Sequence, residues 1–305
     1  MKKIEPKDLS AADINTLATK QATVNLKTNF SKKSNKAASL WTNKKGTSAK
    51  KSAFDEIEKK LKKAILPNGY CHYCEHNEAS EIEHICPKSY FPEQTFVWEN
   101  YLFICGECNR TKLAHFRIFN ATGSNNIQEL PNPVKGSPAF QPPTTDICFI
   151  QSRLENPMEY LLLDLKTGIF IELPILEEAT SVPEKRHRAK AEQTRKILDL
   201  NREILRKSRQ NVATHYKVQL EYAAKIANSN STPQLKNKLP DYFQECLTKI
   251  DFPARKSACL NLVKSNVQKH PYGNPTVWEE IKRQYFLYPD DLAAWFAACP
   301  DALNW

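Results

Sequence analysis

Two Cys-x-x-Cys pairs constrain the fold of this chain more than any other feature of its sequence. They are Cys71 with Cys74 and Cys105 with Cys108. Each pair can present two thiolates from one tight turn, and four thiolates complete the tetrahedral shell that zinc prefers. Residues 75–104 separate the pairs, an interval wider than the roughly 15–20 residues of common zinc ribbons. We therefore expect a structural Zn²⁺ site that encloses a further substructure; the alternative is four buried cysteines without a metal.

The enclosed sequence predicts a small unit of two strands and a helix. Short apolar and β-branched stretches lie within residues 81–89 and 98–112, and apolar residues recur at helical spacing over about 107–116. The order is strand, loop, strand and helix, with zinc at both ends. A unit this small does not fold securely without its metal, so we expect the fold and the zinc site to depend on each other.

Three polar side chains of this unit have the chemistry that phosphodiester hydrolysis needs. A base must take a proton from water, and a cation must neutralise charge on the phosphorane and the leaving oxygen. His84 suits the first role, because an ordinary histidine is substantially neutral at pH 7. Glu83 and Asn109 suit the second, because Mg²⁺ or Mn²⁺ takes hard oxygen ligands. Three cations are placed to contact neighbouring phosphates: Lys88, Arg110 and Lys112.

Strand geometry limits where such a site can lie. Adjacent residues of a regular strand face opposite ways, so Glu83 and His84 cannot both point at one phosphate from mid-strand. We therefore expect the site at the end of the strand, where Pro87 interrupts pairing. Asn109 is expected in the first turn of the following helix, where free N–H groups also favour phosphate.

The remaining histidines and cysteines near the clamp have more ordinary interpretations. His72 and His76 could compete as zinc ligands, but we expect them to support the ligands or to lie exposed. Cys86 is expected to be a small core residue and not a fifth thiol beside the metals. The single cysteines are expected to be buried small hydrophobes: Cys148, Cys246, Cys259 and Cys299.

The start of the chain is a lysine-rich leader. Residues 1–46 show little periodicity, so we expect irregular or mobile structure. Residues 1–66 hold 16 lysines, no arginine and 6 acidic residues, and so account for the whole net charge of +10. Such a leader suits sequence-independent attraction to phosphate. The alternative is a solvated tail that only aids solubility.

The rest of the chain completes a predicted α+β protein. Residues 47–120 combine a helix, ended by Pro67-Asn68-Gly69, with the zinc-clamped unit. Residues 121–182 read as a proline-rich linker followed by a β-hairpin, and residues 183–305 as a largely α-helical region. The aromatic side chains of the last section either fill a core or form a partner surface.

Composition restricts the class of protein. With 305 residues, 41% of them hydrophobic, the chain can form one large domain or two smaller ones. No run approaches the roughly 18 apolar residues that span a bilayer, and the first residues are polar instead of an apolar signal core. Nine cysteines without a signal peptide suit a reducing compartment. We therefore expect a cytoplasmic protein with no membrane association.

Three short motifs carry a family resemblance. Glu83-His84-Ile-x-Pro-Lys, Asn100-x-Leu and Cys108-Asn109-Arg-x-Lys resemble the motifs of HNH (ββα-metal) endonucleases, and the zinc cysteines resemble those of the Cys₄ subgroup. The resemblance implies that His84 is the general base, that Asn109 binds Mg²⁺ and that Asn100 fixes the loop. Asn109 replaces the commoner last histidine, as in HNN-type members. Glu83 stands where many members have Asp, so the family leaves open whether it binds the metal directly or through water.

A wider similarity points to one branch of that family. Gly69-Tyr-Cys-His-Tyr-Cys-Glu, Asn156-Pro-x-Glu-Tyr and Lys190-Ala-Glu-x-Thr resemble the HNH nuclease subunits, called PtuB, of Septu antiphage systems. This resemblance implies a nuclease effector restrained by an ABC-type ATPase similar to PtuA, or linked to a retron ribonucleoprotein. The helical region would then be a docking surface.

Three functions remain open from the sequence. The first is a Mg²⁺-dependent DNA endonuclease, and the second is the same chemistry on RNA, for example tRNA. The motifs contain nothing that reads a 2′-hydroxyl, so sequence does not separate these two. The third is a zinc module that binds nucleic acid or protein without cutting it. His84 and Asn109 argue against the third, because a binding module needs no base beside a set of oxygen ligands.

Overall fold

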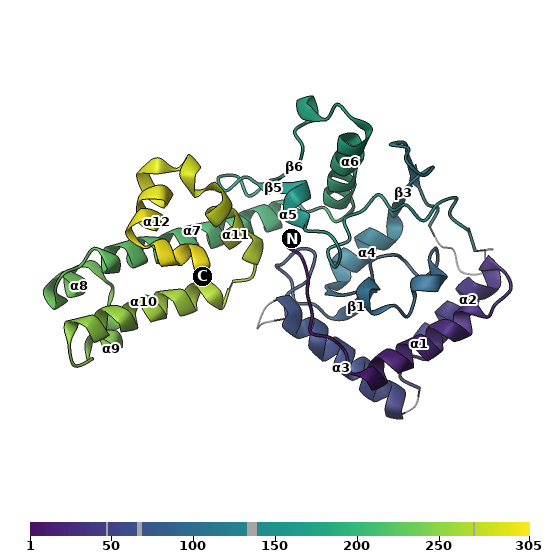
Figure 1. Ribbon diagram of the computed structural model, residues 1–305, viewed down its shortest axis with the longest axis horizontal. Coiled ribbons are helices and arrows are strands. Elements are labelled where there is room, and N and C mark those ends of the chain that lie inside the picture. Colours follow the sequence, from purple (N-terminus) through teal and green to yellow (C-terminus); the bar gives the residue numbers. More distant parts are fainter. Residues whose placement is uncertain (47, 66–68, 133–138, 271) are drawn as a thin grey trace. The chain divides into compact units, whose positions relative to one another are not determined.

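The computed structural model describes residues 1–46, 48–65, 69–132, 139–270 and 272–305 (Figure 1). These residues form an α+β protein in which helices predominate and each sheet has two strands. They divide into two units. Unit 1 comprises Met1–Leu162 and Phe170–Arg202, and unit 2 comprises Leu163–Ile169 and Glu203–Trp305.

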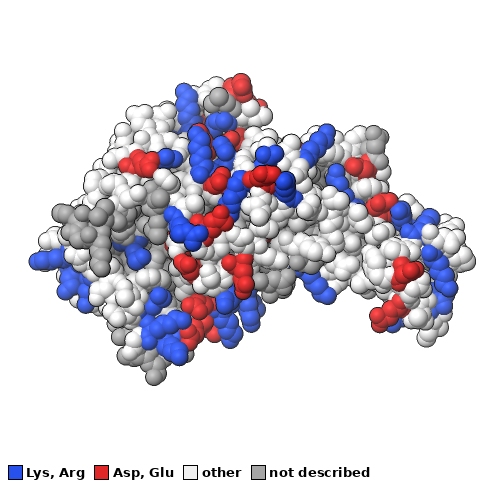
Figure 2. Space-filling view, turned by 180° about the vertical axis from the view of Figure 1, so that it is seen from behind, with Lys and Arg blue, Asp and Glu red and all other residues white. Residues whose placement is uncertain are grey.

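The lysine-rich leader is helical, contrary to the irregular structure expected from its composition. Helices α1 (Ala11–Asn25) and α2 (Phe30–Thr42) begin at Ser10 and Asn29, whose side chains accept hydrogen bonds from the backbone N–H three residues on. Buried apolar residues such as Leu17 anchor these helices to the core. They are widely spaced among lysines, so the sequence shows little helical periodicity. On the face drawn in Figure 2, lysine and arginine side chains are interspersed with acidic ones.

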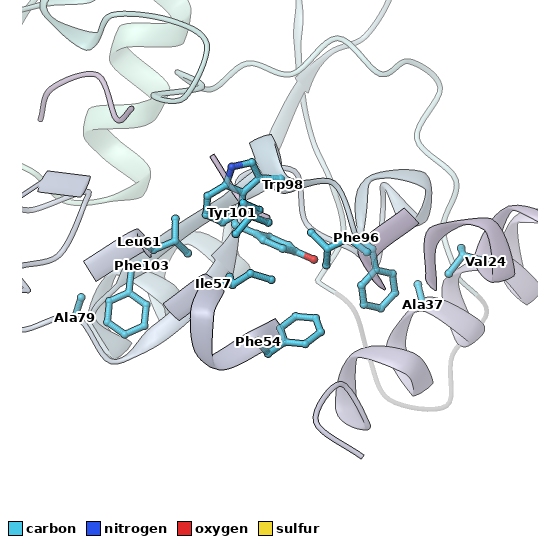
Figure 3. Close-up of a cluster of buried hydrophobic side chains, with 12 residues drawn as sticks. Val24, Ala37, Phe54, Ile57, Leu61, Ala79, Phe96, Trp98, Tyr101 and Phe103 are labelled. Atoms are coloured by element: carbon cyan, nitrogen blue, oxygen red, sulfur yellow. The ribbon is translucent and has the colours of Figure 1, made fainter. Parts of the chain in front are cut away.

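Helix α3 (Ser48–Ile65) is the helix predicted ahead of the zinc-clamped unit. Its buried residues Phe54, Ile57 and Leu61 join a core with residues of α1, α2 and the zinc-clamped unit. Figure 3 shows these side chains beside Tyr101 and Phe103. The predicted stop at Pro67-Asn68 lies outside the described residues.

The predicted order of strand, loop, strand and helix is present. Strand β1 (Glu81–His84) pairs antiparallel with β2 (Tyr101–Ile104), and α4 (Gly106–Ala114) follows directly. The register places Glu81 opposite Ile104 and His84 opposite Tyr101. His84 is thus the last residue of its strand, as the geometry of the proposed site requires. Two 3₁₀ turns lie in the connecting loop: η1 (Pro92–Gln94) and η2 (Trp98–Asn100).

The rest of unit 1 packs further short elements around this centre. They are β3 (Arg117–Phe119), β4 (Ile127–Glu129), α5 (Pro157–Tyr160), β6 (Phe170–Glu172), η3 (Leu176–Glu178) and α6 (Val182–Ile197). The segment read as a linker therefore contributes β4, which pairs with β3. Pro133 and Pro138 of that segment lie outside the described residues.

The predicted β-hairpin is present, and the helices that follow it are divided between the two units. Strand β5 (Leu161–Leu163) pairs with β6, as the hairpin prediction required. The helices expected from residue 183 begin with α6 at Val182, but α6 belongs to unit 1 and the boundary between the units falls after Arg202. The reason is packing: Ala191 and Thr194 are buried, and the Thr194 hydroxyl accepts a hydrogen bond from the Ile150 N–H at 2.8 Å.

Unit 2 is helical apart from the hairpin residues assigned to it. Its helices are α7 (Glu203–Ala227), α8 (Thr232–Lys238), α9 (Gln244–Leu247), α10 (Phe252–Gln268), α11 (Pro275–Gln284) and α12 (Ala294–Ala298). Shorter turns are η4 (Asp241–Phe243), η5 (Tyr285–Leu287), η6 (Pro289–Ala293) and η7 (Pro300–Asn304). Trp278 and Phe296 of the aromatic section are buried, as expected of core residues, whereas Phe286 is 64% exposed. Across the described helices of both units, none combines the length and apolar composition needed to cross a bilayer.

Candidate active site and metal centre

The four predicted zinc cysteines converge in unit 1. The sulfur atoms of Cys71, Cys74, Cys105 and Cys108 all lie within 4.8 Å of one another, and all four residues are buried. The first pair sits in a tight turn closed by a hydrogen bond from the Glu75 N–H to the Cys71 carbonyl at 2.9 Å. The second pair lies at the start of α4, where Cys105 is the N-cap residue. Two turns that lie far apart in the sequence therefore each supply two ligands of one site.

This thiol cluster has the donor set of a structural zinc site. Burial raises the pKa of the Cys71 thiol, and four thiolates this close repel one another. A cation at their centre removes both penalties, and four sulfurs around a tetrahedral ion leave no position open for a substrate. The cluster can therefore hold Zn²⁺ in a structural role.

Neighbouring candidates do not compete for that ion. Both ring nitrogens of His72 face backbone groups: Nε2 lies 3.0 Å from the Leu61 carbonyl, and Nδ1 accepts from the Phe103 N–H at 3.1 Å. Burial lowers the pKa of His72 to about 3, so the ring is a neutral support for the clamp. Cys86 is buried outside the cluster, and burial raises its pKa to about 12, as suits a small core residue. Of the single cysteines, only Cys246 is not fully buried.

A pocket of about 290 Å³ lies along β1. Strand β2 covers one edge of β1 and no described strand pairs with the other edge. The lining residues come from β1 and the segments on either side of it, from α2 and the turn after it, and from α3 and α4: Trp41, Lys44, Glu58, Ser80, Glu81, Ile82, Glu83, His84, Lys88 and Asn109. Because both faces of β1 reach this pocket, Glu83 and His84 can line it while pointing to opposite faces of the strand.

His84 is held as a neutral base. Its Nε2 atom lies 2.9 Å from the Thr95 carbonyl oxygen. A carbonyl can only accept, so Nε2 carries the proton and Nδ1 keeps its lone pair. Burial, reinforced by the charge of Lys88, lowers the pKa of His84 well below its usual value. The imidazole is therefore unprotonated at neutral pH and able to accept a proton at Nδ1.

Aromatic rings fix the orientation of this imidazole. The His84 ring centroid lies 4.2 Å from that of Trp41 and 5.3 Å from that of Tyr101, both in edge-to-face geometry. The Tyr101 hydroxyl donates to the Thr95 carbonyl at 2.7 Å, the same oxygen that His84 contacts. The ring is held on two sides and at one nitrogen, which restricts its rotation.

Asn109 and Glu81 meet at the pocket. The Asn109 Nδ2 atom donates to Glu81 Oε2 at 2.5 Å. The Asn109 Oδ1 atom is buried and, within the described part of the chain, has no hydrogen-bond partner. A buried carbonyl oxygen without a partner is uncommon in a folded protein, and it is a ligand type that Mg²⁺ accepts.

Glu83 forms a buried ion pair instead of facing open solvent. Its Oε1 atom lies 2.5 Å from Lys112 Nζ, and the two side chains are 7% and 0% exposed. Lys112 also donates to the His84 carbonyl at 2.6 Å. The structure therefore does not place Lys112 where a phosphate could contact it, because the Glu83 carboxylate on β1 draws it inward. Removing one partner of such a pair typically costs about 3–5 kcal/mol.

Asn100 ties down the loop that follows β1. Its Oδ1 atom accepts from the Cys86 N–H at 2.7 Å, and its Nδ2 atom donates to the Cys86 carbonyl at 3.1 Å. Nδ2 also donates to the Gln94 carbonyl at 2.9 Å. These three bonds fix the chain two residues beyond His84, which is the loop-fixing position expected of Asn100.

Of the basic side chains near the pocket, Lys44 and Lys88 line it and Arg110 does not. Lys88 lines it, and burial lowers the pKa of its ammonium. Arg110 is exposed on α4. Lys44, which the sequence did not single out, also lines the pocket, with its ammonium 4.6 Å from the Trp41 ring centroid.

Trp41, Glu58 and Glu81 also line the pocket, and none of them belongs to the three sequence motifs. For Glu81 the alternation of strand residues was a usable signal, because it places Glu81 on the face of Glu83. Trp41 and Glu58 carried none, because they lie on helices distant in sequence from the motifs.

Comparison with known proteins adds nothing to this picture. No model of a protein family, no curated protein and no solved structure matches the chain. The functional assignment therefore depends on the chemistry of the pocket and the thiol cluster.

Proposed function

We propose that this protein is a metal-dependent endonuclease of the HNH (ββα-metal) type. One observation carries the proposal: the free Nδ1 lone pair of His84 and the unpartnered Oδ1 atom of Asn109 belong to residues lining one pocket. A neutral base beside an oxygen ligand is the pair of groups that metal-assisted hydrolysis of a phosphodiester needs. A module that only binds nucleic acid has no use for a desolvated, oriented imidazole.

The base acts on the attacking water. His84 Nδ1 takes a proton from that water as its oxygen forms a bond to phosphorus. The bond from phosphorus to the 3′-oxygen breaks in the same displacement, and the leaving oxygen takes a proton from solvent, which gives a 5′-phosphate and a 3′-hydroxyl. The Thr95 carbonyl accepts from Nε2–H throughout, so it stabilises the imidazolium that forms.

The residues present fit a hard divalent cation. Asn109 and an acidic side chain of β1 would hold Mg²⁺ or Mn²⁺, which when bound neutralises charge on the phosphorane and the leaving oxygen. Asn109 directly follows Cys108, and its N–H donates to the Cys105 carbonyl at 3.1 Å. A zinc ion in the thiol cluster would therefore fix the helical turn that presents Asn109, without taking part in the reaction.

DNA is the favoured substrate and RNA, for example tRNA, the alternative. The pocket holds Lys44 and Lys88, both suited to phosphate, and phosphate contacts do not distinguish the two nucleic acids. The motif similarity to Septu nuclease subunits supports an antiphage role beside an ABC-type ATPase or a retron ribonucleoprotein. The exposed Phe286 and Leu287 of unit 2 suit a partner surface.

The test is a cleavage assay with both substrates. Supercoiled plasmid and total tRNA are incubated with the zinc-loaded protein in Mg²⁺, Mn²⁺ or EDTA. The proposal predicts cutting of plasmid in either metal and none in EDTA; cutting of tRNA alone would select the RNA alternative. Intact substrates under every condition, including addition of the candidate ATPase partner, would contradict the nuclease.

A further inference from the structure

We propose that Glu81, and not Glu83, is the carboxylate that holds the catalytic cation together with Asn109. The inference rests on the proposed function, since it names a ligand of that same site. The motif similarity points to Glu83, the residue before His84. The contacts of the two carboxylates point to Glu81.

Glu81 lies against the amide of Asn109. The 2.5 Å contact joins Glu81 Oε2 to Asn109 Nδ2. Gly106, at the start of α4, keeps the approach open, because a Cβ there would lie 3.2 Å from Glu81 Oε1. Glu81 and Asn109 both line the pocket that contains His84. The carboxylate and the amide therefore already occupy one corner of the site.

The spacing of these groups suits two ligands of one ion. Adjacent oxygens around an octahedral Mg²⁺, each at about 2.1 Å, lie about 3 Å apart. The Glu81–Asn109 contact, at 2.5 Å, is shorter than that separation, so the two side chains would move slightly apart to hold one ion. The oxygen and nitrogen of an amide have almost the same shape, so a half-turn of the Asn109 amide would present Oδ1 where Nδ2 now lies.

The unpartnered oxygen of Asn109 is the second observation. Its Oδ1 atom is buried and has no hydrogen-bond partner among the described residues. A cation bound with Glu81 would satisfy that oxygen, while the amide hydrogens would turn away from the carboxylate.

Glu83 is engaged elsewhere. Its ion pair with Lys112 is almost fully buried, and Lys112 also donates to the His84 carbonyl. Moving the Glu83 carboxylate to a metal would leave a buried ammonium without its counter-charge. Glu83 therefore positions His84 through Lys112, whereas Glu81 is the carboxylate beside Asn109.

Glu81 and Glu83 lie on the same face of β1 but contact different residues of α4. Glu81 and Glu83 alternate with Ile82, so both point toward α4. Asn109 and Lys112, three residues apart on that helix, take one carboxylate each. A neutral amide leaves a carboxylate's charge available to a cation; an ammonium neutralises it.

The test measures Mn²⁺ binding to the zinc-loaded full chain by electron paramagnetic resonance, with no nucleic acid present. The variants are Glu81→Gln, Glu83→Gln, Asn109→Ala and the exposed control Glu99→Gln. Glu83→Gln is also tested with Lys112→Met, so that no buried ammonium is left alone if the single variant folds poorly. Zinc content and circular dichroism establish that each protein is folded.

We expect Glu81→Gln and Asn109→Ala to weaken Mn²⁺ binding roughly tenfold or more, and the Glu83 variants to bind within about threefold of the parent. Loss of binding in the Glu83 variants, with Glu81→Gln unaffected, would overturn this inference and leave the nuclease proposal intact. A parent protein that binds no Mn²⁺ would overturn both.

Discussion

The indole ring of Trp41 and the imidazole ring of His84 lie edge to face with their centroids 4.2 Å apart. Trp41 belongs to α2, in the lysine-rich leader, and His84 ends β1. A segment whose composition suggested a mobile basic tail therefore supplies one wall of the candidate active site. The leader contributes both the ring that restrains the base and, through Lys44, a cation at the same pocket.

Trp41→Ala should lower the rate of cleavage without removing the base. The imidazole would lose its restraint on one face, and misplacement of a catalytic group by about 1 Å can cost about a hundredfold. We expect a fall of roughly 10- to 100-fold in single-turnover rate, with most of the rate retained in Trp41→Phe. Trp295→Ala, in unit 2, is the matched control. Equal rates for Trp41→Ala and the parent protein would show that the contact has no role in catalysis.

The buried ion pair between Glu83 and Lys112 should dominate local stability. Lys112→Met leaves the Glu83 carboxylate buried and unpaired, so we expect a loss of about 3–5 kcal/mol in the free energy of unfolding. Adding Glu83→Gln should recover part of that loss, because the uncompensated charge is gone. Urea denaturation of the two single variants and the double variant measures this coupling. Additive losses would mean that the two side chains do not interact in solution.

The thiol cluster should bind one zinc ion that the fold requires. Zinc sites of this kind contribute about 10–16 kcal/mol of apparent binding free energy, which is comparable to the whole stability of a domain. Cys108→Ala is therefore expected to lose zinc and the cooperative unfolding of unit 1. Cys86→Ala, a buried cysteine outside the cluster, should keep both. Elemental analysis and thermal unfolding check the prediction, and a full zinc complement in Cys108→Ala would refute it.

Stability should fall as the pH drops below the ordinary range of histidine. The pKa of His84 is lowered by burial, so between that pKa and about 6.5 the unfolded chain binds a proton that the folded chain does not. Each pH unit in this window costs about 1.4 kcal/mol of folding free energy. Urea denaturation without Mg²⁺ at pH 7.5 and 5.5 should show a steeper decline for the parent protein than for His84→Asn. Parallel declines would show that His84 titrates normally when folded.

The sequence predicted the zinc-clamped unit well because that unit depends on local patterns. The cysteine spacing required two turns to meet, and the apolar stretches between them required strands. The observed β1, β2 and α4, and the convergence of Cys71, Cys74, Cys105 and Cys108, follow from these constraints. The helix ending near residue 65 followed from Phe54, Ile57 and Leu61 at helical spacing.

What the sequence could not predict depends on contacts between distant segments. Leu17 and Val24 lie too far apart in the sequence to produce a recognisable helical pattern, yet both are buried in the core of unit 1. Lys112 has the sequence context of a surface cation, because nothing near it in sequence signals a partner; its partner, Glu83, lies on another element. The choice between Glu81 and Glu83 likewise depends on how α4 lies along β1.

The most direct test of the account replaces the base. Under conditions where the parent protein cuts plasmid in Mg²⁺, His84→Ala should be slower by about 10²–10⁴-fold, the usual contribution of a general base. Its zinc content and Mn²⁺ affinity should be unchanged, because His84 is assigned to neither metal. Plasmid cleavage by His84→Ala at the rate of the parent protein would contradict the assignment of His84 and the mechanism built on it.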